Sequence, residues 1–400
     1  MDSVTTLVAG QRPGWTLEGD FYTNRDMFRL ESNQIFRRSW LYAGHASRIP
    51  KRGDFFLYET ASESIILIRG DQGLVHALHN VCRHRGSRVC TASSGRSEKL
   101  VCPYHQWVYD IDGSLLKARL APEGFDRSSF GLKRVSVCCL EGLIFICLDA
   151  NPPDFASFAK RVGPQLRPQH LEAASVVHSR RYELRANWKL VVENSRECYH
   201  CGAGHPQYCR AVAFAAGIDS PRVAEEDRMR TLEHIRRLAS IGIEARPVPF
   251  VKDSWFHCRR FFLRPGFESE SMDGQPVAPR MAELPGSELG ALAVVAYPNF
   301  LLEANSDYAM AMRFTPLTEV ATRVDMEWLI DADAAKSEAV DVERLESFWR
   351  LTAEQDWRLC EENQRGVETM GYEPGPYAPD EKGVEQFVGW YLRQIEKVAA

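Results

Sequence analysis

The sequence predicts an α+β protein with a small all-β domain and a larger domain in which helices flank an antiparallel sheet. The chain has 400 residues, more than a single domain usually contains. Residues 41–150 are short β-rich runs separated by turns, and residues 151–154 (NPPD) form a proline-rich boundary. Through residues 151–400, strand patterns are followed by a long helical pattern.

Local patterns predict the first elements along the chain. Residues 1–40, amphipathic around 24–40, are expected to form a helical segment that packs on the larger domain. In the small domain, 64–70 and 74–78 are β-rich runs joined by Asp-Gln-Gly, which is typical of a hairpin. Residues 106–110 predict another strand, followed by a turn.

The larger domain is expected to combine several strands with two helices. Strands are predicted at 175–187, 255–263, 291–303, 308–315 and 322–330. Helices are predicted at 188–202 and 335–369, and the Gly-, Pro- and Ser-rich stretch 265–287 is predicted to be a mobile loop. Strands and helices in this order favour an antiparallel sheet.

Composition and charge exclude several classes of partner. The net charge is −5 and no Lys/Arg tract is present, so no nucleic-acid partner is expected. The longest apolar stretch, near 142–148, is far too short to span a bilayer, and the first ten residues lack the basic flank of a secretory signal. Most of the eleven cysteines lie in apolar segments, which predicts free buried thiols and a cytoplasmic location.

Two short segments each pair a cysteine with a histidine, Cys82-Arg83-His84 and Cys102-Pro103-Tyr104-His105. Two cysteines and two histidines suit a Rieske [2Fe–2S] cluster, in which the cysteines hold one iron and the histidines hold the other. A zinc site is the alternative, although zinc usually takes paired cysteines and paired histidines. Cys90 lies between the segments without a paired ligand and is interpreted as a packing residue.

A second metal site is predicted in residues 187–206 (NWKLVVENSRECYHCGAGHP). On a helix, Asn194, Glu197 and His200 would share one face. Glycines and a proline then end the helix, so that His205 can return toward His200. The alternative is a solvated helix end with incidental histidines.

The third ligand of such a site is expected to be a carboxylate, because two histidines and one carboxylate form the facial triad of non-haem iron(II). Asp356 falls on the apolar stripe of the predicted C-terminal helix, where a carboxylate is costly unless it is paired or bound to a metal. A buried salt bridge is the alternative role for Asp356. Asp307 is a weaker candidate for the ligand.

Together these segments resemble the catalytic α subunit of the Rieske-type non-haem iron oxygenases. The resemblance rests on residues 80–113, which contain NVCRHRGSRVC and LVCPYHQWVYDIDG, on 187–206, and on 354–366 (EQDWRLCEENQRG). It implies a helix-grip, START-like catalytic domain and a head-to-tail homotrimer in which the cluster of one subunit lies beside the iron of the next. The implied cluster ligands are Cys82, His84, Cys102 and His105, and the implied iron(II) ligands are His200, His205 and Asp356.

One position departs from the ring-hydroxylating members, which usually have an aspartate where this chain has Glu197. In the family this residue bridges a cluster histidine, by position His105, to an iron histidine, His200, across the subunit interface. The glutamate version in ENSRECYHC is similar to the branch that acts on glycine betaine, proline betaine and carnitine.

The resemblance implies an oxidative N-demethylase. A flavin/[2Fe–2S] reductase would pass electrons from NAD(P)H to the cluster and then to the iron, and O2 would oxidise an N-methyl group of a betaine-type quaternary amine with release of formaldehyde. Asn194 is expected to line this site. The alternatives are an aromatic-ring hydroxylating dioxygenase with the same metal centres and a Rieske electron carrier without chemistry of its own.

A quaternary ammonium has no N–H to donate, so aromatic faces are expected to bind it. Candidates near predicted strand ends are Trp255, Phe256, Tyr297, Phe300 and Tyr308. An arginine is expected to bind the substrate carboxylate, but the sequence does not select one.

Overall fold

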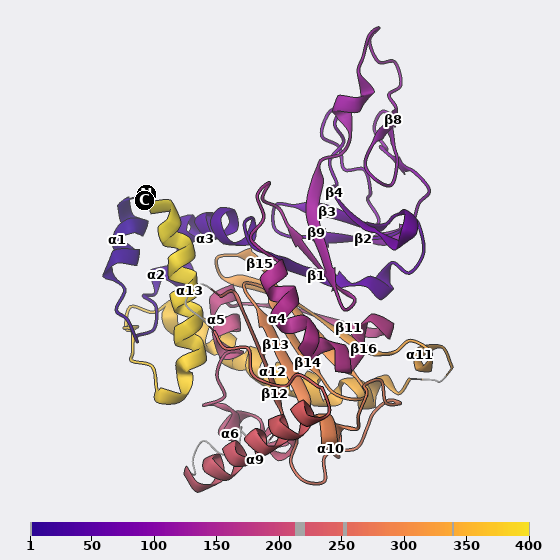
Figure 1. The fold of residues 1–400 in the computed structure, drawn as a ribbon. Coiled ribbons are helices and arrows are strands. Elements are labelled where there is room, and N and C mark those ends of the chain that lie inside the picture. The colour runs from indigo at the N-terminus through magenta and orange to yellow at the C-terminus, as the bar shows by residue number, and fades with distance from the viewer. Residues whose placement is uncertain (1, 213–220, 251–253, 338–339, 400) are drawn as a thin grey trace. The chain divides into compact units, whose positions relative to one another are not determined.

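The computed structural model describes residues 2–212, 221–250, 254–337 and 340–399. The chain divides into two compact units (Figure 1). The β unit comprises Arg38–Pro153, and the α+β unit comprises Met1–Arg37 together with Asp154–Ala400. The chain therefore passes from the β unit back into the α+β unit within the proline-rich segment at 151–154.

The β unit contains a seven-stranded and a three-stranded sheet, and every strand pair is antiparallel. The larger sheet has the order β1 (Leu41–His45), β10 (Leu143–Cys147), β9 (Arg134–Leu140), β4 (Val75–His79), β3 (Ser64–Arg69), β2 (Asp54–Glu59), β5 (Ser94–Arg96). The smaller sheet has the order β6 (Leu100–Val101), β7 (Val108–Tyr109), β8 (Leu115–Lys117). The predicted hairpin is confirmed, because β3 pairs with β4 across the Asp71–Gly73 turn.

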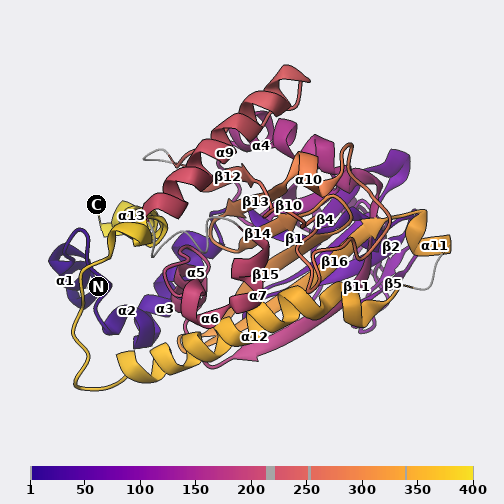
Figure 2. The ribbon, with the colours of Figure 1, turned by 90° about the horizontal axis from the view of Figure 1, so that it is seen from below.

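The core of the α+β unit is a six-stranded antiparallel sheet, as predicted. Its order is β11 (Ala174–Leu184), β16 (Ala321–Asp331), β15 (Ala309–Thr318), β14 (Phe300–Ala304), β13 (Ala291–Ala296), β12 (Phe256–Phe261). Figure 2 shows the long helix α12 (Val342–Val367) running beside this sheet, next to α5, α6 and α7. These three short helices are Trp188–Asn194, Cys201–Gly204 and Pro206–Ala211.

The N-terminal helices belong to the α+β unit. The buried carboxylate of Glu31, the last residue of α3 (Arg25–Glu31), lies 2.5 Å from Lys189 Nζ and accepts hydrogen bonds from Trp188 Nε1 and the Tyr391 hydroxyl. A buried carboxylate needs such partners to offset its desolvation. The other α-helices of the described ranges are α1 (Asp2–Gly10), α2 (Asp20–Thr23), α4 (Ala156–Leu166), α9 (Pro221–Ser240), α10 (Gly286–Leu289), α11 (Ala334–Ser337) and α13 (Lys382–Ala399).

Three predicted elements of the α+β unit are wrong in their extent. The strand predicted over 291–303 is a hairpin, because the chain turns between β13 and β14. The helix predicted over 335–369 is divided into α11 and α12, and the Asp341 side chain caps α12 by accepting from the Arg344 amide at 3.1 Å. The helix predicted over 188–202 ends at Asn194, so Glu197 and His200 lie in a turn.

The segment predicted to be a mobile loop, 265–287, is irregular but packed. Its Ser269 and Glu270 are fully buried. The Ser269 hydroxyl donates to Asp307 Oδ1 at 2.7 Å, and the Glu270 amide donates to Asn305 Oδ1 at 3.0 Å. Side-chain oxygens from the β14–β15 turn thus supply the partners that a regular element would otherwise supply.

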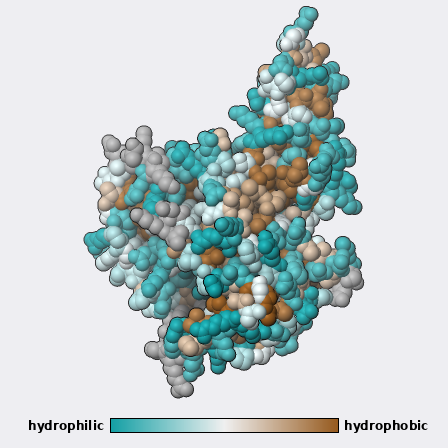
Figure 3. Space-filling view, viewed as in Figure 1, coloured by the Kyte–Doolittle hydropathy of each residue, from teal (hydrophilic) through white to brown (hydrophobic). Residues whose placement is uncertain are grey.

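The described part of the chain contains no helix that is both long enough and apolar enough to cross a membrane. Figure 3 shows hydrophobic residues gathered in patches on the visible face of the β unit, with hydrophilic residues around them. Exposed hydrophobic residues of this unit include Val81, Val101 and Tyr104, which adjoin the predicted cluster ligands.

Candidate metal centres and substrate cavity

The two predicted cluster segments form loops with the same backbone pattern. In each loop the cysteine amide donates to the carbonyl five residues later, and the amide four residues later donates back to the cysteine carbonyl. These distances are 2.8 and 3.0 Å in the Cys82 loop and 2.9 and 3.0 Å in the Cys102 loop. The residue four positions after each cysteine, Gly86 or Gln106, has a positive φ of 77° or 58°. The two loops thus share one backbone frame, although the histidine is the second residue after Cys82 and the third after Cys102.

The loops bring the four predicted cluster ligands into a suitable arrangement. Cys82 and Cys102 are only 3% and 1% exposed, whereas His84 is exposed and His105 is half-buried. The two imidazole rings lie 4.6 Å apart between centroids. Thiolates on the inside and neighbouring imidazoles on the outside match the unequal ends of a Rieske cluster. The donor set therefore fits this group.

The partner of Cys82 was not predicted from the sequence. The Tyr109 hydroxyl lies 3.2 Å from Cys82 Sγ and accepts a hydrogen bond from the Arg83 amide at 3.0 Å. Burial raises the pKa of Tyr109 far above the physiological range, so the hydroxyl keeps its proton and can donate it to the sulfur. Hydrogen bonds to cluster sulfurs tune the reduction potential.

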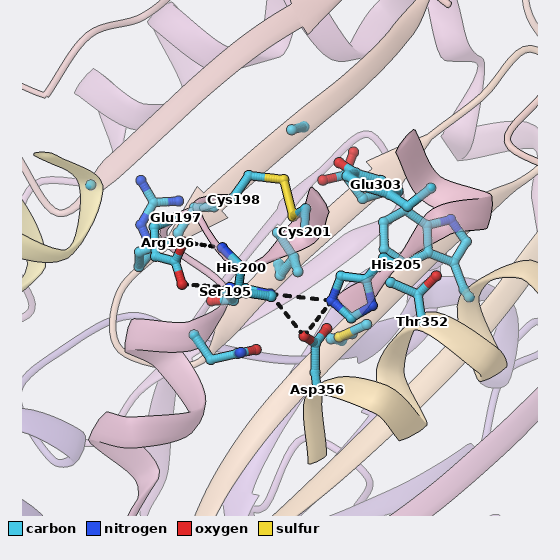
Figure 4. Close-up of a pocket in the computed structure, with 18 of the residues that line it drawn as sticks. Ser195, Arg196, Glu197, Cys198, His200, Cys201, His205, Glu303, Thr352 and Asp356 are labelled. Carbon is cyan, nitrogen blue, oxygen red and sulfur yellow. Dashed lines mark hydrogen bonds and ion pairs between the residues drawn. A yellow bond between two sulfur atoms is a disulfide. The ribbon is translucent and has the colours of Figure 1, made fainter. Parts of the chain in front are cut away.

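The second predicted site is assembled from two histidines and an aspartate of the α+β unit (Figure 4). His200 precedes α6, His205 lies between α6 and α7, and Asp356 projects from α12. The two Nε2 atoms lie 3.2 Å apart. Asp356 Oδ1 lies 3.2 Å from His200 Nε2 and 2.8 Å from His205 Nε2.

These three donor atoms fit a metal ion with open positions. Ligands at right angles around a metal with bonds of about 2.1 Å lie about 3.0 Å apart, which is close to all three separations. Two imidazole nitrogens and one carboxylate oxygen form the donor set of a facial triad for iron(II). Without a metal, the two imidazole nitrogens and the carboxylate oxygen would have only shared protons between them at this point.

Cys201 also lies beside the histidines, since one ligand atom from each of His200, Cys201 and His205 falls within 4.8 Å of the others. However, Cys201 forms a disulfide with Cys198. A sulfur in a disulfide is not the thiolate that binds metals, which favours Asp356 as the third ligand.

The disulfide corrects the prediction that all cysteines outside the cluster are free thiols. Cys198 and Cys201 are three residues apart, and the turn brings their Cα atoms to 4.9 Å, within the range that a disulfide spans. That prediction was based on the apolar surroundings of the cysteines and on an expected reducing cytoplasm. Neither indicates that a local turn brings Cys198 and Cys201 together. The disulfide closes a small loop that contains Tyr199 and His200.

Each histidine has a partner on its other ring nitrogen. Glu197 Oε1 lies 2.5 Å from His200 Nδ1, and Glu197 also accepts from the Tyr199 amide. Gln355 Oε1 lies 2.8 Å from His205 Nδ1. An acceptor at Nδ1 holds the proton there and leaves the Nε2 lone pair for a metal.

Sequence reasoning found Glu197 but missed Gln355. Gln207 Nε2 donates to Gln355 Oε1 at 2.8 Å and to Thr352 Oγ1 at 3.1 Å, so the amide oxygen is held facing His205. Gln355 directly precedes the predicted ligand Asp356 in the sequence, and this position was the only indication that it lies near the site. Its contact with His205, however, depends on how α12 packs against α7.

The carboxylates polarise both imidazoles in the metal-free chain. Burial lowers the pKa of His200, but hydrogen bonds to Asp356 and Glu197 outweigh burial and raise that pKa to about 10. Burial likewise lowers the pKa of His205, but the hydrogen bond to Asp356 and its charge outweigh burial and raise that pKa. A metal ion bound here would therefore displace protons from the imidazoles.

The alternative ligand, Asp307, does not reach this site. Its side chain is buried and accepts from Ser269 Oγ and the Val277 amide, each at 2.7 Å. Burial raises the pKa of Asp307 to about 6 despite these hydrogen bonds. Asp307 therefore anchors the irregular 265–287 segment.

A cavity of about 430 Å³ adjoins the triad. His200, His205 and Asp356 line one side, and Asn194 lines it as predicted. Residues from the sheet and α12 that line it include Arg259, Ala293, Glu303, Met312, Trp349 and Trp357, with Tyr208 from α7 and Arg196 from the turn. The five aromatic residues proposed from sequence are absent from this lining in the described ranges, because they lie on other faces of their strands or in turns.

Comparison with known families supports this arrangement of centres. Residues 39–129 match the Rieske [2Fe–2S] domain, and residues 171–397 match the catalytic domain of the ring-hydroxylating α subunit. The chain belongs to the family of ring-hydroxylating α subunits. It is a Rieske non-haem iron oxygenase with a [2Fe–2S] cluster and a mononuclear iron, and it works with a reductase and a small-molecule substrate.

The oxygenase is similar to some curated relatives over nearly its whole length and to others over about half of it. It is 37% identical to the glycine betaine monooxygenase oxygenase subunit of Chromohalobacter salexigens, over 98% of this chain and 88% of the relative. It is 34% identical to the carnitine monooxygenase oxygenase subunit of Escherichia coli strain K12, over 51% of this chain and 56% of the relative.

Solved structures share the fold of the oxygenase at low identity. A quaternary ammonium Rieske monooxygenase in complex with L-carnitine matches with a TM-score of 0.71 and 22% identity, over 97% of each chain. Naphthalene 1,2-dioxygenase from Rhodococcus matches with a TM-score of 0.67 and 18% identity, over 98% of this chain and 97% of the other.

The geometry at His205 predicts the effect of changing Gln355. Gln355→Leu removes the acceptor at Nδ1, so we expect the affinity for iron(II) to fall by about 10–100-fold, as changes beside metal ligands typically do. Gln355→Glu keeps an acceptor and should retain most of the affinity. Iron titration of the metal-depleted protein measures both, and equal affinities for wild type and Gln355→Leu would contradict this role.

Proposed function

We propose that this protein is the terminal oxygenase of a system that demethylates a betaine-type quaternary amine, with glycine betaine as the first candidate substrate and proline betaine as the next. The observation that carries the proposal is the charge inside the cavity. Arg196, Arg259 and Glu303 line it together with the triad. A cavity built for an aromatic hydrocarbon would bear the cost of burying these charges without using them.

The resemblance to relatives supports the same substrate class. The relatives matched over most of the chain are named for glycine betaine, and those matched over half of it are named for carnitine. Both compounds combine a quaternary ammonium with a carboxylate. The arginines and the carboxylate in the cavity are chemically suited to such a zwitterion.

We propose that Cys82, His84, Cys102 and His105 hold the cluster and that His200, His205 and Asp356 hold iron(II). When bound, iron(II) at such a triad supplies open coordination positions for the activation of dioxygen. The protein supplies the orientation: Glu197 and Gln355 keep protons on Nδ1 of the two imidazoles.

Residues of the cavity would hold the substrate beside the triad. Trp349, Trp357 and Tyr208 offer aromatic faces to N-methyl groups. An arginine, Arg259 or Arg196, would bind the substrate carboxylate. The overall reaction balances as trimethylammonium substrate, O2, two electrons and two protons giving formaldehyde, water and the protonated dimethyl product.

We further propose that electrons pass from His105 of one subunit through Glu197 of its neighbour to His200 within a homotrimer. Glu197 contacts His200, and Tyr199, which directly precedes His200, is exposed. Val81, Val101 and Tyr104 give the cluster loops an exposed apolar rim suited to an interface. The solved structure of a quaternary ammonium Rieske monooxygenase that shares this fold gave insights into inter-subunit electron transfer in that protein. A reductase fed by NAD(P)H would place the system in the cytoplasm.

Formaldehyde release tests the proposed reaction. With a surrogate reductase, NADH and O2, we expect glycine betaine to yield about one formaldehyde and one dimethylglycine per NADH consumed. The matched control is 3,3-dimethylbutanoate, which has the same shape but carbon in place of nitrogen and cannot release formaldehyde by this route. A cis-diol or phenol from an aromatic substrate, with no formaldehyde from any betaine, would instead support the ring hydroxylase.

A further inference from the structure

We infer that Glu303 is the residue that recognises the positive charge of the substrate, and that it selects a quaternary ammonium group over an uncharged tert-butyl group of the same shape. The inference rests on the proposed function and adds a specificity-determining residue to it. It starts from a carboxylate that the fold holds inside the cavity without a complete set of partners.

The sheet directs Glu303 into the cavity. Leu301 and Glu303 lie two residues apart on β14 and both line the cavity, as expected when alternate side chains share one face. In Figure 4 the carboxylate of Glu303 and that of Asp356 lie on opposite sides of the two imidazoles. Glu303 and the triad residues line the same cavity, so a substrate beside the triad would share that cavity with Glu303.

The carboxylate of Glu303 lacks the partners that a buried acid normally has. The side chain is 6% exposed, and Oε2 has no hydrogen-bond donor among the described residues. Leaving such an oxygen unpaired costs free energy. A quaternary ammonium suits this environment, because it brings positive charge to the oxygen but has no N–H that would need an acceptor.

Strand register places the opposite charge nearby. Arg259 on β12 pairs with Ala293 on β13, which in turn pairs with Glu303 on β14. The Cα atoms of Arg259 and Glu303 are thus two strand spacings apart, about 9.6 Å. The small side chain of Ala293 lies between them and also lines the cavity. This arrangement offers a cation site and an anion site on one sheet face, as a betaine requires.

The electrostatic environment of Glu303 supports the same role. Burial and the neighbouring Glu270 raise the pKa of Glu303 well above its ordinary value, while Arg259 and Arg196 oppose that shift. A bound cation would favour the ionised form and so strengthen the interaction.

The test compares Glu303→Gln with wild type by calorimetric titration of the iron- and cluster-loaded protein with two ligands. These are glycine betaine and 3,3-dimethylbutanoate, an isostere that has carbon in place of the quaternary nitrogen and so keeps the carboxylate but lacks the positive charge. We expect wild type to bind glycine betaine at least about 30-fold more tightly than the isostere. Glu303→Gln should lose about that factor for glycine betaine and little or nothing for the isostere. Glu346→Gln is the matched control, since Glu346 is a buried carboxylate outside the cavity lining that pairs with Arg180, and its affinities should change by about twofold at most.

The outcomes separate this inference from the proposed function. Equal affinities of wild type and Glu303→Gln for glycine betaine would overturn the role of Glu303 while leaving the demethylase intact. Wild-type protein that binds no quaternary amine would overturn both. Loss of mononuclear iron in Glu303→Gln would overturn the inference by assigning Glu303 to the metal. The wild-type comparison of the two ligands remains decisive if the variant does not fold.

Discussion

Asp356→Ala is expected to remove the mononuclear iron and leave the cluster in place. The aspartate supplies the only oxygen among the three converging donors, at 3.2 and 2.8 Å from the two Nε2 atoms. We expect the iron content to fall from about three to about two per chain, with the visible spectrum of the cluster unchanged. Formaldehyde formation should fall on the order of 10³-fold or more. Elemental analysis and the visible spectrum of one sample measure both effects.

Asp307→Asn provides the control for this variant. Asp307 is also a buried aspartate of the α+β unit, but it accepts from Ser269 and Val277 rather than facing the histidines. We expect it to keep all of its iron and to lose some thermal stability, because an amide cannot accept both hydrogen bonds in the same geometry. Normal iron in Asp356→Ala together with depleted iron in Asp307→Asn would exchange the two assignments.

Glu197→Gln is expected to slow electron transfer from the cluster to the mononuclear iron, while both metal centres stay occupied. The carboxylate accepts from His200 Nδ1, and we propose that its other side faces the cluster histidine of a neighbouring subunit. Replacing it with an amide removes the negative charge and one acceptor. With the cluster reduced beforehand, we expect its oxidation by O2 and substrate to slow by about 100-fold. Stopped-flow absorbance of the cluster measures this step directly.

Two comparisons make the result for Glu197 specific. Glu197→Asp retains the charge and should transfer electrons faster than Glu197→Gln. Reduction of the cluster by the reductase should be unaffected in both variants, because that step precedes the bridge. Cluster oxidation at the wild-type rate in Glu197→Gln would refute the proposed electron path, even if the iron ligands are correct.

The fold class and the candidate metal-binding residues that the structure brings together could be predicted from the sequence, because they depend on local spacing. Cys82 and His84, like Cys102 and His105, sit within one turn of chain, and each loop is closed by its own backbone hydrogen bonds. His200 and His205 are similarly close in sequence. β-rich runs identified the sheet strands, although the turn between β13 and β14 was missed because both strands are continuously buried.

Other features depended on contacts that the sequence pattern did not show, some within one turn of chain and others between distant segments. The helix predicted through 188–202 ends at Asn194, where Glu197 accepts from the backbone of the following turn and the Cys198–Cys201 disulfide closes it. The aromatic residues of the cavity come from α7 and α12, whereas sequence reasoning sought them near strand ends. Gln355 acts on His205 only because α12 packs against α7.

The sequence by itself determined which metals this protein can hold, since a ligand set is written in residue types and short spacings. Only the tertiary structure decided what lies opposite the metal. Arg259, Ala293 and Glu303 are separated by tens of residues or lie on different strands, and they meet because three antiparallel strands align in register on one face. Long-range register is set by packing over the whole sheet, and so the charge pattern that selects a substrate appears only once the chain is folded.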